Sequence, residues 1–360
     1  MKKISVIGIV GLPPCYGGFE TFVDVLVRNL SKEFIFTVFC SSKIYQKKID
    51  TYNGAYLEYL RFKPNGIQSV LYDSLAAMKS IKTHDILLFL GVSGSIILPF
   101  LRKKGAKIVI NIDGIEWKRK KWNYAVRLYL RLSELMAVRS ADIIIVDNMA
   151  IKQYLDSTYN INAVYIPYGA DHVKKLILSK ETTYRYPFLN EKPYALNVAR
   201  FEPENNIDLI LEAFKELNMY NLILIGGWNK SKYGKNLKRK YEKYKNIYFL
   251  GGIYDQVVLN EIRSNAYVYI HGHSVGGTNP ALIEAMYLGL PIIAYKCTFN
   301  ISTTKGKSKY FLNKEELISI INNLNTEMLM KMREESMIIA RKEYVWEKVL
   351  DRYKAIFNEI

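Results

Sequence analysis

Cysteine is scarce in this chain of 360 residues, which holds only Cys15, Cys40 and Cys297. The three lie far apart, so they form no zinc-ligand spacing and no disulfide framework. Structural zinc and a disulfide-stabilised secreted fold are therefore not expected. A protein with few, scattered cysteines fits a reducing compartment, and we expect it in the cytoplasm.

A long, uninterrupted apolar run is also absent. The most apolar stretch, residues 86–101, is shorter than the ~20 residues that a membrane-spanning helix needs, and glycine, serine and proline interrupt it. We interpret it as a buried strand over 85–90, followed by a loop and a short helix. The chain begins Met-Lys-Lys and continues directly into a strand pattern, without the apolar core of a signal peptide.

Three common ligand motifs are missing. The glycine turn at 11–20 does not have the G-x-G-x-x-G spacing of a dinucleotide site. Gly306-Lys307-Ser308 is not a Walker loop, because Ile301 stands where its leading glycine belongs. No Asp-x-Asp pair is present to hold a metal-bound diphosphate. We therefore expect neither a metal ion nor a cofactor.

Acidic residues are outnumbered, 34 against 51 basic ones, which gives a net charge of +17. Residues 102–139 hold eleven Lys/Arg and three Asp/Glu, including the run Trp117-Lys-Arg-Lys-Lys-Trp122. Basic residues flanked by tryptophan suit an anionic membrane surface, whereas a second basic run at 230–245 suits a solvated helix face. No nucleic-acid-binding module is recognisable, so we expect no nucleic acid.

The sequence does have two series of apolar runs that alternate with helical patterns, which predicts parallel sheets covered by helices. The first series of strands is expected at 4–9, 34–40, 56–62, 85–90, 107–112, 142–146 and 163–167. The second is expected at 194–198, 221–225, 246–250, 266–270 and 291–295. We predict an N-terminal domain at 1–168, a linker at 169–190, a C-terminal domain at 191–340 and a final segment at 341–360.

The most informative segment is His271–Met286, a glycine-rich loop that opens into an apolar helix. Thr278 or Asn279 can cap this helix, and Pro280 suits its first position. A capped helix start offers free backbone N–H groups and the positive end of the helix dipole, which bind phosphate. Glu284 follows about one turn later, where a carboxylate can accept hydrogen bonds from two sugar hydroxyls. The alternative is a simple helix cap followed by a solvated glutamate.

A second glycine loop, Gly11–Glu20, links the strand at 4–9 to a helix with apolar residues at spacings of three and four. Strand, glycine turn and helix form the first unit of a doubly wound nucleotide-binding fold. Two such loops in separate halves predict one ligand held from both sides.

Several segments together resemble the GT-B glycosyltransferases, in particular the bacterial retaining group of the glycosyltransferase family 4 type that includes rhamnosyltransferases of polysaccharide synthesis. The segments that carry the resemblance are Tyr16–Val23, Asn111–Arg119, Ile166–Asp171, Ala199–Asn206 and His271–Met286. The resemblance implies an α/β fold of two Rossmann-like doubly wound domains that face each other across a cleft. It also implies that the last helix, at 344–357, returns to the first domain, the alternative being a helix that packs on its own domain.

Arg200 follows the strand at 194–198, and a side chain at that strand end points into the ligand crevice of an open sheet. Its guanidinium can hold a diphosphate leaving group, although a surface salt bridge is the alternative. Relatives place a lysine shortly afterwards, in Pro-Glu-Lys-Gly, where this chain has Pro203-Glu-Asn-Asn206. A second cation for the diphosphate must therefore come from elsewhere, or backbone N–H groups must suffice.

The resemblance also implies the donor site. Glu284 matches the second glutamate of the Glu-x7-Glu motif and is expected to bind the ribose, but the first position is Gly276. The missing donor-sugar contact favours a deoxy sugar such as rhamnose. The remaining donor-binding residues that we predict are Gly17, Gly18, Tyr254, His273, Gly277, Thr278 and Asn279. Of these, Tyr254 is expected near the base, and His273, with His271, is expected to line the site rather than bind metal.

Asp113 and Glu116 follow the strand at 107–112, where GT-B relatives present acceptor-side groups. Either carboxylate can accept the proton of the acceptor hydroxyl, or orient that hydroxyl; a turn aspartate and a surface glutamate are the alternatives. We expect a retaining, metal-independent transferase that moves L-rhamnose from dTDP-rhamnose, or a hexose from a UDP-sugar, to a lipid-linked saccharide. Its expected location is the inner face of the cell membrane. A GT-B sugar-nucleotide epimerase and a non-catalytic sugar-nucleotide-binding membrane scaffold are the rival hypotheses.

Overall fold

The computed structural model describes residues 1–15, 17–66, 68–102, 105–119 and 122–360. They form two compact units. Unit 1 comprises Met1–Lys118, Trp122–Tyr168 and Trp346–Ile360, and unit 2 comprises Arg119–Lys121 and Gly169–Val345.

Unit 1 is built on a sheet whose strands, in the described residues, follow the order β3-β4-β2-β1-β5-β6-β7-β8. The strands are β1 (Lys3–Ile7), β2 (Ile35–Ser41), β3 (Thr51–Tyr52), β4 (Ala55–Leu60), β5 (Ile86–Leu90), β6 (Lys107–Ile112), β7 (Ile143–Val146) and β8 (Val164–Tyr165). Pairing is parallel except between β3 and β4. The strand order reverses between β1 and β5, whose carboxyl ends therefore border the usual ligand crevice of a doubly wound sheet.

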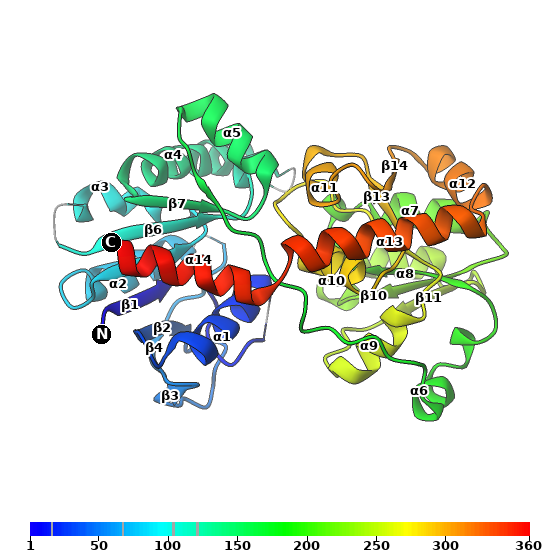
Figure 1. Ribbon diagram of the computed structural model, residues 1–360, viewed down its shortest axis with the longest axis horizontal. Helices are drawn as coiled ribbons and strands as arrows, with labels where there is room; N and C mark the ends of the chain where they lie inside the picture. The colour runs from blue at the N-terminus through cyan, green and yellow to red at the C-terminus, as the bar shows by residue number, and fades with distance from the viewer. Residues whose placement is uncertain (16, 67, 103–104, 120–121) are drawn as a thin grey trace. The chain divides into compact units, whose positions relative to one another are not determined.

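The helices of unit 1 cover this sheet (Figure 1). They are α1 (Gly18–Leu30), α2 (Gln68–Ser80), η1 (Ser95–Ile97), α3 (Leu98–Leu101), η2 (Glu116–Lys118), α4 (Tyr124–Ser140), α5 (Met149–Tyr159) and α14 (Trp346–Glu359). The last helix, α14, lies against α1, with the rings of Tyr353 and Phe22 4.7 Å apart and those of Phe357 and Phe34 5.5 Å apart. The buried aromatic face of α14 thus fills the core of unit 1.

Unit 2 contains a parallel sheet of order β11-β10-β9-β12-β13-β14 in the described residues. Its strands are β9 (Tyr194–Val198), β10 (Asn221–Ile225), β11 (Ile247–Leu250), β12 (Val268–His271), β13 (Ile292–Tyr295) and β14 (Lys309–Phe311). In order of appearance this is 3-2-1-4-5-6, the strand order of a Rossmann fold. The reversal falls between β9 and β12.

The helices of unit 2 lie along both faces of its sheet (Figure 1). They are α6 (Lys180–Arg185), η3 (Pro187–Leu189), η4 (Pro203–Asn205), α7 (Ile207–Phe214), η5 (Trp228–Lys230), α8 (Lys232–Tyr241), α9 (Gln256–Ser264), α10 (Pro280–Tyr287), α11 (Thr298–Thr303), α12 (Lys314–Asn322) and α13 (Thr326–Glu343). The fully buried Ile210, Leu211 and Phe214 of α7 share one core with Leu222 and Leu224 of β10. The α/β fold predicted from alternating strand and helix patterns is confirmed.

Two features differ from the sequence-based expectation. The segment at 169–190, predicted as a linker, carries α6 and η3 and is fastened to α9, because Glu261 accepts hydrogen bonds from Ser179 N at 3.1 Å and Ser179 Oγ at 2.9 Å. The final segment, predicted from 341, joins unit 1 only at Trp346. Before that point α13 continues to Glu343, and Tyr344 O accepts a hydrogen bond from Ala170 N at 2.8 Å within unit 2.

The apolar stretch at 86–101 and the second basic run at 230–245 have the structures that their patterns predict. Residues 86–101 form β5, η1 and α3, as the interrupted apolar pattern predicts. No helix in the described part of the chain combines the length and apolar character that a membrane span requires. In the basic run at 230–245, Lys232, Lys235 and Arg239 of α8 are exposed, which agrees with a solvated helix face.

Candidate functional site

Most of the predicted donor residues of unit 2 lie where its strand order reverses, whereas Tyr254 follows the edge strand β11. Arg200 follows β9, and the loop His273–Asn279 follows β12, which pairs with β9 in the sheet. The carboxyl ends of both strands therefore lie at the same edge, at the place where open α/β sheets bind ligands. The structure brings together residues that are more than seventy positions apart in sequence.

Hydrogen bonds fasten these two loops to each other. Glu204 O accepts from Ser274 N at 2.9 Å, and Asn206 Nδ2 donates to Gly272 O at 2.7 Å. A Cβ atom on Gly272 would lie 2.1 Å from Asn205 O, so only glycine permits this approach. Asn206 adopts φ +47°, a left-handed conformation that asparagine tolerates. Asn205 and Asn206 thus hold the loops together.

His273 lies buried between the two loops. Asn205 Nδ2 donates to Arg200 O at 2.6 Å, so Asn205 Oδ1 faces His273 and accepts from its Nδ1 at 2.5 Å. Burial lowers the pKa of His273 well below its ordinary value, and the charges of His271, Arg119 and Arg200 lower it further. The imidazole is therefore neutral, and two guanidinium groups lie close enough to act on it.

Arg119 is a site residue that the sequence did not reveal. It is 8% exposed, and its Nη1 lies 2.8 Å from Glu204 Oε1 in a buried ion pair. The prediction that Arg119 belongs to a membrane-facing basic run is therefore wrong, because the ion pair takes its side chain away from the surface. Lys118 of the same run is exposed, with Nζ 5.3 Å from the centre of the Trp117 ring. Lys120 and Lys121 lie outside the described residues.

The glycine loop leads into α10 as predicted. Asn279, rather than Thr278, is the N-cap, since its Oδ1 accepts from Ala281 N at 3.0 Å. Thr278 is buried, and Gly277 is half-buried. Gly276 adopts φ +128°, and a Cβ atom there would lie 2.8 Å from His273 Nε2. This positive φ and the close approach to His273 both favour glycine at position 276.

Glu284 of α10 is held by two basic side chains. Its Oε2 lies 2.5 Å from Arg263 Nη2, and its Oε1 lies 3.2 Å from His172 Nε2. Burial alone raises the pKa of Glu284, but the charge of Arg263 and the hydrogen bond from His172 outweigh burial and lower it. The carboxylate is thus ionised and fixed in place. Neither Arg263 nor His172 was predicted as a site residue, although His172 directly follows the segment Ile166–Asp171.

Tyr254, predicted near the base, lies between β11 and α9, and its side chain is 74% exposed. Its ring lies close to Gly252, where an added Cβ atom would be 3.1 Å from the tyrosine hydroxyl. An exposed aromatic ring beside a glycine is available for stacking on a base. Its contact with a base remains a prediction.

In unit 1, the predicted glycines stand at the start of α1. Gly17 is its N-cap, without a side-chain hydrogen bond to the helix, and Gly18 is its first residue. Tyr16 lies outside the described residues. Glu20, in the first turn, is 3% exposed, and its Oε1 accepts from Val10 N at 2.9 Å. The carboxylate of Glu20 thereby fixes the loop that follows β1.

Asp113 and Glu116, the predicted acceptor-side carboxylates, are half-buried after β6, and Glu116 begins η2. Burial raises the pKa of Tyr168 well above its ordinary value, and the charges of Asp147 and Asp113 raise it further. Asp113 and Asp147 therefore lie near Tyr168 at the carboxyl edge of the unit 1 sheet. Asp147, 1% exposed after β7, is a second acidic group that the sequence did not single out.

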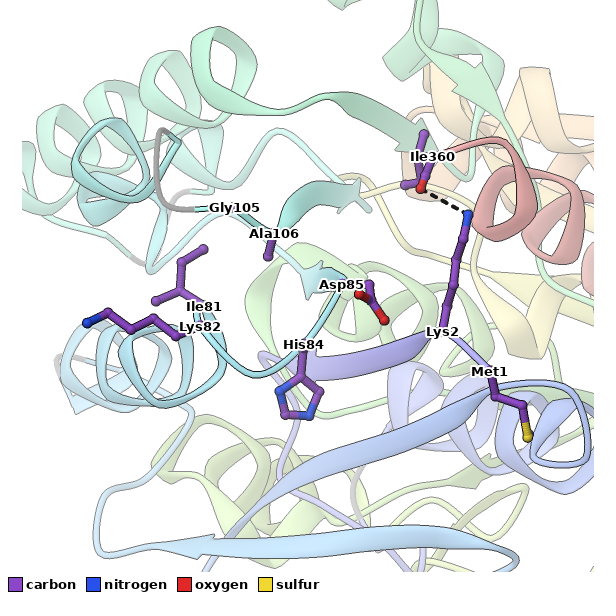
Figure 2. Close-up of a pocket in the computed structure, with 9 residues that line it drawn as sticks. All are labelled: Met1, Lys2, Ile81, Lys82, His84, Asp85, Gly105, Ala106 and Ile360. Carbon is purple, nitrogen blue, oxygen red and sulfur yellow. Dashed lines mark hydrogen bonds between the residues drawn. The ribbon is translucent and has the colours of Figure 1, made fainter.

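A hollow of about 580 Å³ lies elsewhere on unit 1, as Figure 2 shows. It lies beside the amino ends of β1, β5 and β6, with Lys2, Asp85 and Ala106 in its lining. Lys2 Nζ donates to Ile360 O at 3.0 Å on one side of it (Figure 2). This hollow is thus at the opposite edge of the sheet from Gly17 and Asp113. Among the described residues no cluster of three or more His, Cys, Asp or Glu side chains suits a metal ion.

Comparison with known proteins agrees with this arrangement. Residues 180–335 match the family "Glycosyl transferases group 1", and residues 1–171 match "Domain of unknown function (DUF1972)". A relative from Haemophilus influenzae, named an uncharacterized glycosyltransferase, is 25% identical over 266 residues, which cover 70% of this chain and 71% of that protein. Protein CapJ of Staphylococcus aureus is 26% identical over 152 residues, 39% of this chain and 38% of CapJ.

Solved structures share the whole fold at low sequence identity. Sucrose-phosphate synthase from Thermosynechococcus elongatus has a TM-score of 0.83 at 16% identity, covering 100% of this chain and 99% of the synthase. HepE from Anabaena, solved with UDP-glucose, has a TM-score of 0.77 at 14% identity over 100% of both chains. The glycosyltransferase WaaG has a TM-score of 0.70 at 14% identity, covering 97% of this chain and 98% of WaaG.

Two Rossmann-like sheets with these structural likenesses define the fold as GT-B, as predicted. Residues 180–335 are thus similar to the glycosyltransferase group 1 family, and a relative named a glycosyltransferase matches 70% of the chain.

Proposed function

We propose that this protein is a retaining glycosyltransferase that moves L-rhamnose from dTDP-rhamnose onto a lipid-linked oligosaccharide during cell-surface polysaccharide synthesis. The observation that carries the proposal is the edge of the unit 2 sheet where β9 and β12 end. Arg200, the buried neutral His273 and the capped start of α10 meet there. A guanidinium group and backbone N–H groups both bind phosphate. Because position 276 is glycine, no carboxylate there repels a diphosphate.

Arg119 is our proposed second cation for that diphosphate. The guanidinium groups of Arg119 and Arg200 both lower the pKa of His273, so both lie near this imidazole. Glu204 holds Arg119 through an ion pair, with an N–O distance of 2.8 Å. A guanidinium has five N–H donors and can contact more than one anionic group. Arg119 would thus take the role of the lysine that relatives carry where this chain has Asn205.

The proposed chemistry requires no protein nucleophile. The bond between the sugar C1 and the diphosphate oxygen breaks while the acceptor oxygen bonds to C1 from the same face. The acceptor proton passes to the departing diphosphate, whose growing charge Arg200 and the α10 N–H groups stabilise. Asp113 or Glu116 orients the acceptor hydroxyl. No metal ion is assigned a role, since guanidinium groups and backbone donors meet the phosphate charge.

We infer the identity of the donor sugar from position 276. A glutamate there would hydrogen-bond donor-sugar hydroxyls, whereas Gly276 offers no side chain and its φ of +128° disfavours one. A 6-deoxy sugar has one hydroxyl fewer to satisfy, which supports rhamnose. A UDP-linked hexose is the second candidate, and it is supported by HepE, a protein of the same fold that was solved with UDP-glucose.

We infer a membrane-bound acceptor from the basic residues that follow Trp117. Lys118 is exposed, and the sequence continues with Lys120 and Lys121, so a tryptophan stands at each end of this basic run. The carboxylates Asp113 and Glu116 precede the run in the chain. Such a segment can hold unit 1 at an anionic surface that carries a lipid-diphosphate acceptor. The enzyme would then work as a peripheral protein on the inner face of the membrane.

A thermal-shift screen tests the donor proposal. The purified protein is heated with dTDP-rhamnose, UDP-glucose, UDP-galactose, UDP-N-acetylglucosamine or GDP-mannose, because a ligand that binds the folded state raises the melting temperature by mass action. We expect the largest shift with dTDP-rhamnose. A larger shift with a UDP-sugar would replace rhamnose by that sugar, and no shift with any nucleotide sugar would contradict the proposed function.

A further inference from the structure

The surroundings of Glu284 contain more than a ligand carboxylate requires. Arg263, in the last turn of α9, is 5% exposed, and its Nη2 lies 2.5 Å from Glu284 Oε2. His172 approaches from a separate segment and donates from Nε2 to Oε1 at 3.2 Å. The two oxygens of one carboxylate are thus held by two side chains from different parts of unit 2.

This arrangement fixes both the position and the rotation of the carboxylate. One contact alone would allow the carboxylate to rotate, whereas contacts to both oxygens prevent rotation. Removing Arg263 would leave Glu284, only 13% exposed, without its ionic partner in a poorly solvated place. Beneath the pair, Tyr269 of β12 is fully buried, and the charges of Arg263 and Glu284 act in opposite directions on the pKa of its hydroxyl. The pair is therefore packed on the sheet.

The held carboxylate still has room for hydrogen-bond donors. Each carboxylate oxygen offers about two lone-pair directions. Arg263 occupies one direction on Oε2 and His172 one on Oε1, which leaves about one direction on each oxygen. Glu284 is partly exposed, so a hydroxyl group from outside the protein can reach it.

We propose that Arg263 and His172 are positioning residues, which hold the Glu284 carboxylate so that it accepts a hydrogen bond from the 3′-hydroxyl of the donor's nucleoside sugar. This inference rests on the proposed function, because it takes Glu284 as a donor-binding residue. The 3′-hydroxyl occurs both in the deoxyribose of dTDP and in the ribose of UDP. The role is therefore independent of the base and of the transferred sugar.

Calorimetry with paired nucleotides tests this inference. The dissociation constants of dTDP and 3′-deoxy-dTDP, and of UDP and 3′-deoxy-UDP, are measured for the wild type and for Arg263→Gln. A hydrogen bond to a charged group makes a hydroxyl count for about tenfold or more in affinity. We expect the wild type to bind the parent nucleotide about tenfold more tightly than the 3′-deoxy analogue. In Arg263→Gln this ratio should fall towards one.

Two further variants separate positioning from stability. Glu261→Gln alters the same helix two residues away, where the carboxylate accepts hydrogen bonds from Ser179, and it should keep the wild-type ratio. His172→Asn changes a side chain that is 34% exposed, so its fold should survive even where that of Arg263→Gln does not. The ratio should fall severalfold in His172→Asn.

Each result has a distinct meaning. If Arg263→Gln and His172→Asn keep the wild-type ratio, the inference is overturned and the cluster is structural. Nucleotide binding by the wild type would still support the proposed function. A wild-type ratio near one would show that Glu284 does not bind the 3′-hydroxyl, which also overturns the inference. If the wild type binds neither dTDP nor UDP, the proposed function fails as well.

Discussion

Side chains around His273 divide into those that build the site and those that remain available to a ligand. The side-chain amides of Asn205 and Asn206 form the hydrogen bonds that hold the two loops. Arg200, by contrast, is fastened through its backbone carbonyl, while its side chain is exposed. A guanidinium whose backbone is fixed and whose side chain is accessible is suited to hold a phosphate.

Replacing Arg200 by alanine should therefore lower kcat by roughly a hundredfold or more, because the departing diphosphate loses a charge-assisted contact. The melting temperature should hardly change, since the carbonyl that accepts from Asn205 remains. Steady-state kinetics and a melting curve measure both effects. Arg239→Ala, at an exposed position on α8, is the matched loss of one arginine and should keep full activity. A folded Arg200→Ala enzyme with near-normal kcat would make Arg200 a structural residue.

His271 gives a prediction about pH. It is 2% exposed, its Nε2 has no hydrogen-bond partner among the described residues, and burial lowers its pKa from 6.5 to about 3. Below pH 6.5 the unfolded chain binds a proton that the folded chain does not. The stability contributed by the neutral ring is therefore complete above pH 6.5 and is lost as the pH falls towards about 3.

The loss amounts to at most about 1.4 kcal/mol per pH unit for one histidine. His271→Phe keeps a flat ring beside Tyr269 but removes the titrating group. Denaturant unfolding between pH 7 and pH 4 should show a shallower decline in the free energy of unfolding for this variant than for the wild type. Parallel declines in the two proteins would mean that His271 takes up its proton without unfolding.

Among the elements, the loop between β12 and α10 shows how backbone geometry sets the chemistry of the site. Gly276 has a positive φ and lies close to His273, and Asn279 and Pro280 start the helix. The N–H groups of this turn are the proposed phosphate donors, and their directions depend on that conformation. The proposed phosphate binding therefore depends on the conformation at Gly276.

Gly276→Ala should weaken binding of the free nucleoside diphosphate and lower the free energy of unfolding by about 1–3 kcal/mol, because alanine is strained at this φ and its methyl group meets the imidazole. Calorimetry and denaturant unfolding give the two quantities. Gly251→Ala is the control, since an added Cβ atom there has no neighbour within 4 Å and its φ is not in the positive range. Equal behaviour of the two variants would contradict the assigned role of the turn.

The sequence predicts the positions of the strands better than it predicts long-range contacts. β6, β9 and β10 begin and end where the apolar pattern predicts, because each is a buried run with polar boundaries. The short edge strands β3 and β14 were not predicted, since two or three residues carry no periodicity.

In the candidate site, too, local features were predicted and long-range contacts were not. Asn279, Pro280 and Gly276 belong to local turn chemistry, which the sequence displays. The ion pairs of Arg119 with Glu204 and of Arg263 with Glu284 join residues 85 and 21 positions apart, and no local pattern marks either arginine. For Arg119 the local pattern misleads, because the residue stands in a basic run yet is buried. Long-range ion pairs depend on packing, which a single sequence does not reveal.

At the scale of the whole molecule, the net charge of +17 raises the question of membrane attachment. With Arg119 committed to Glu204, the proposed docking segment relies on Lys118, Lys120 and Lys121. Each contributes about 1 kcal/mol at an anionic surface. Replacing all three by Gln should abolish flotation with phosphatidylserine vesicles at low salt, while turnover of a short, water-soluble acceptor should hardly change.

The matched control removes the same charge elsewhere. Lys232, Lys235 and Lys243 are exposed, on α8 and just after it, and their replacement by Gln should leave flotation intact. The attraction should also fade as salt shortens the Debye length, from about 10 Å at 0.1 M to about 3 Å at 1 M. Flotation lost equally in both triple variants would indicate a response to net charge alone, and a wild type that ignores vesicles would remove the membrane from the proposal.

We propose above all that unit 2 binds a nucleotide sugar and that the enzyme breaks the bond between the sugar and the diphosphate. The direct measurement is the release of nucleoside diphosphate from dTDP-rhamnose and from the UDP- and GDP-sugars, in excess EDTA, by wild type and by Arg200→Ala. We predict slow release from one donor by the wild type without any acceptor, and little or none by Arg200→Ala. Release that requires magnesium or manganese would contradict the metal-independent mechanism. No release from any donor, with metal or without and with lipid-linked acceptors present, would contradict the account as a whole.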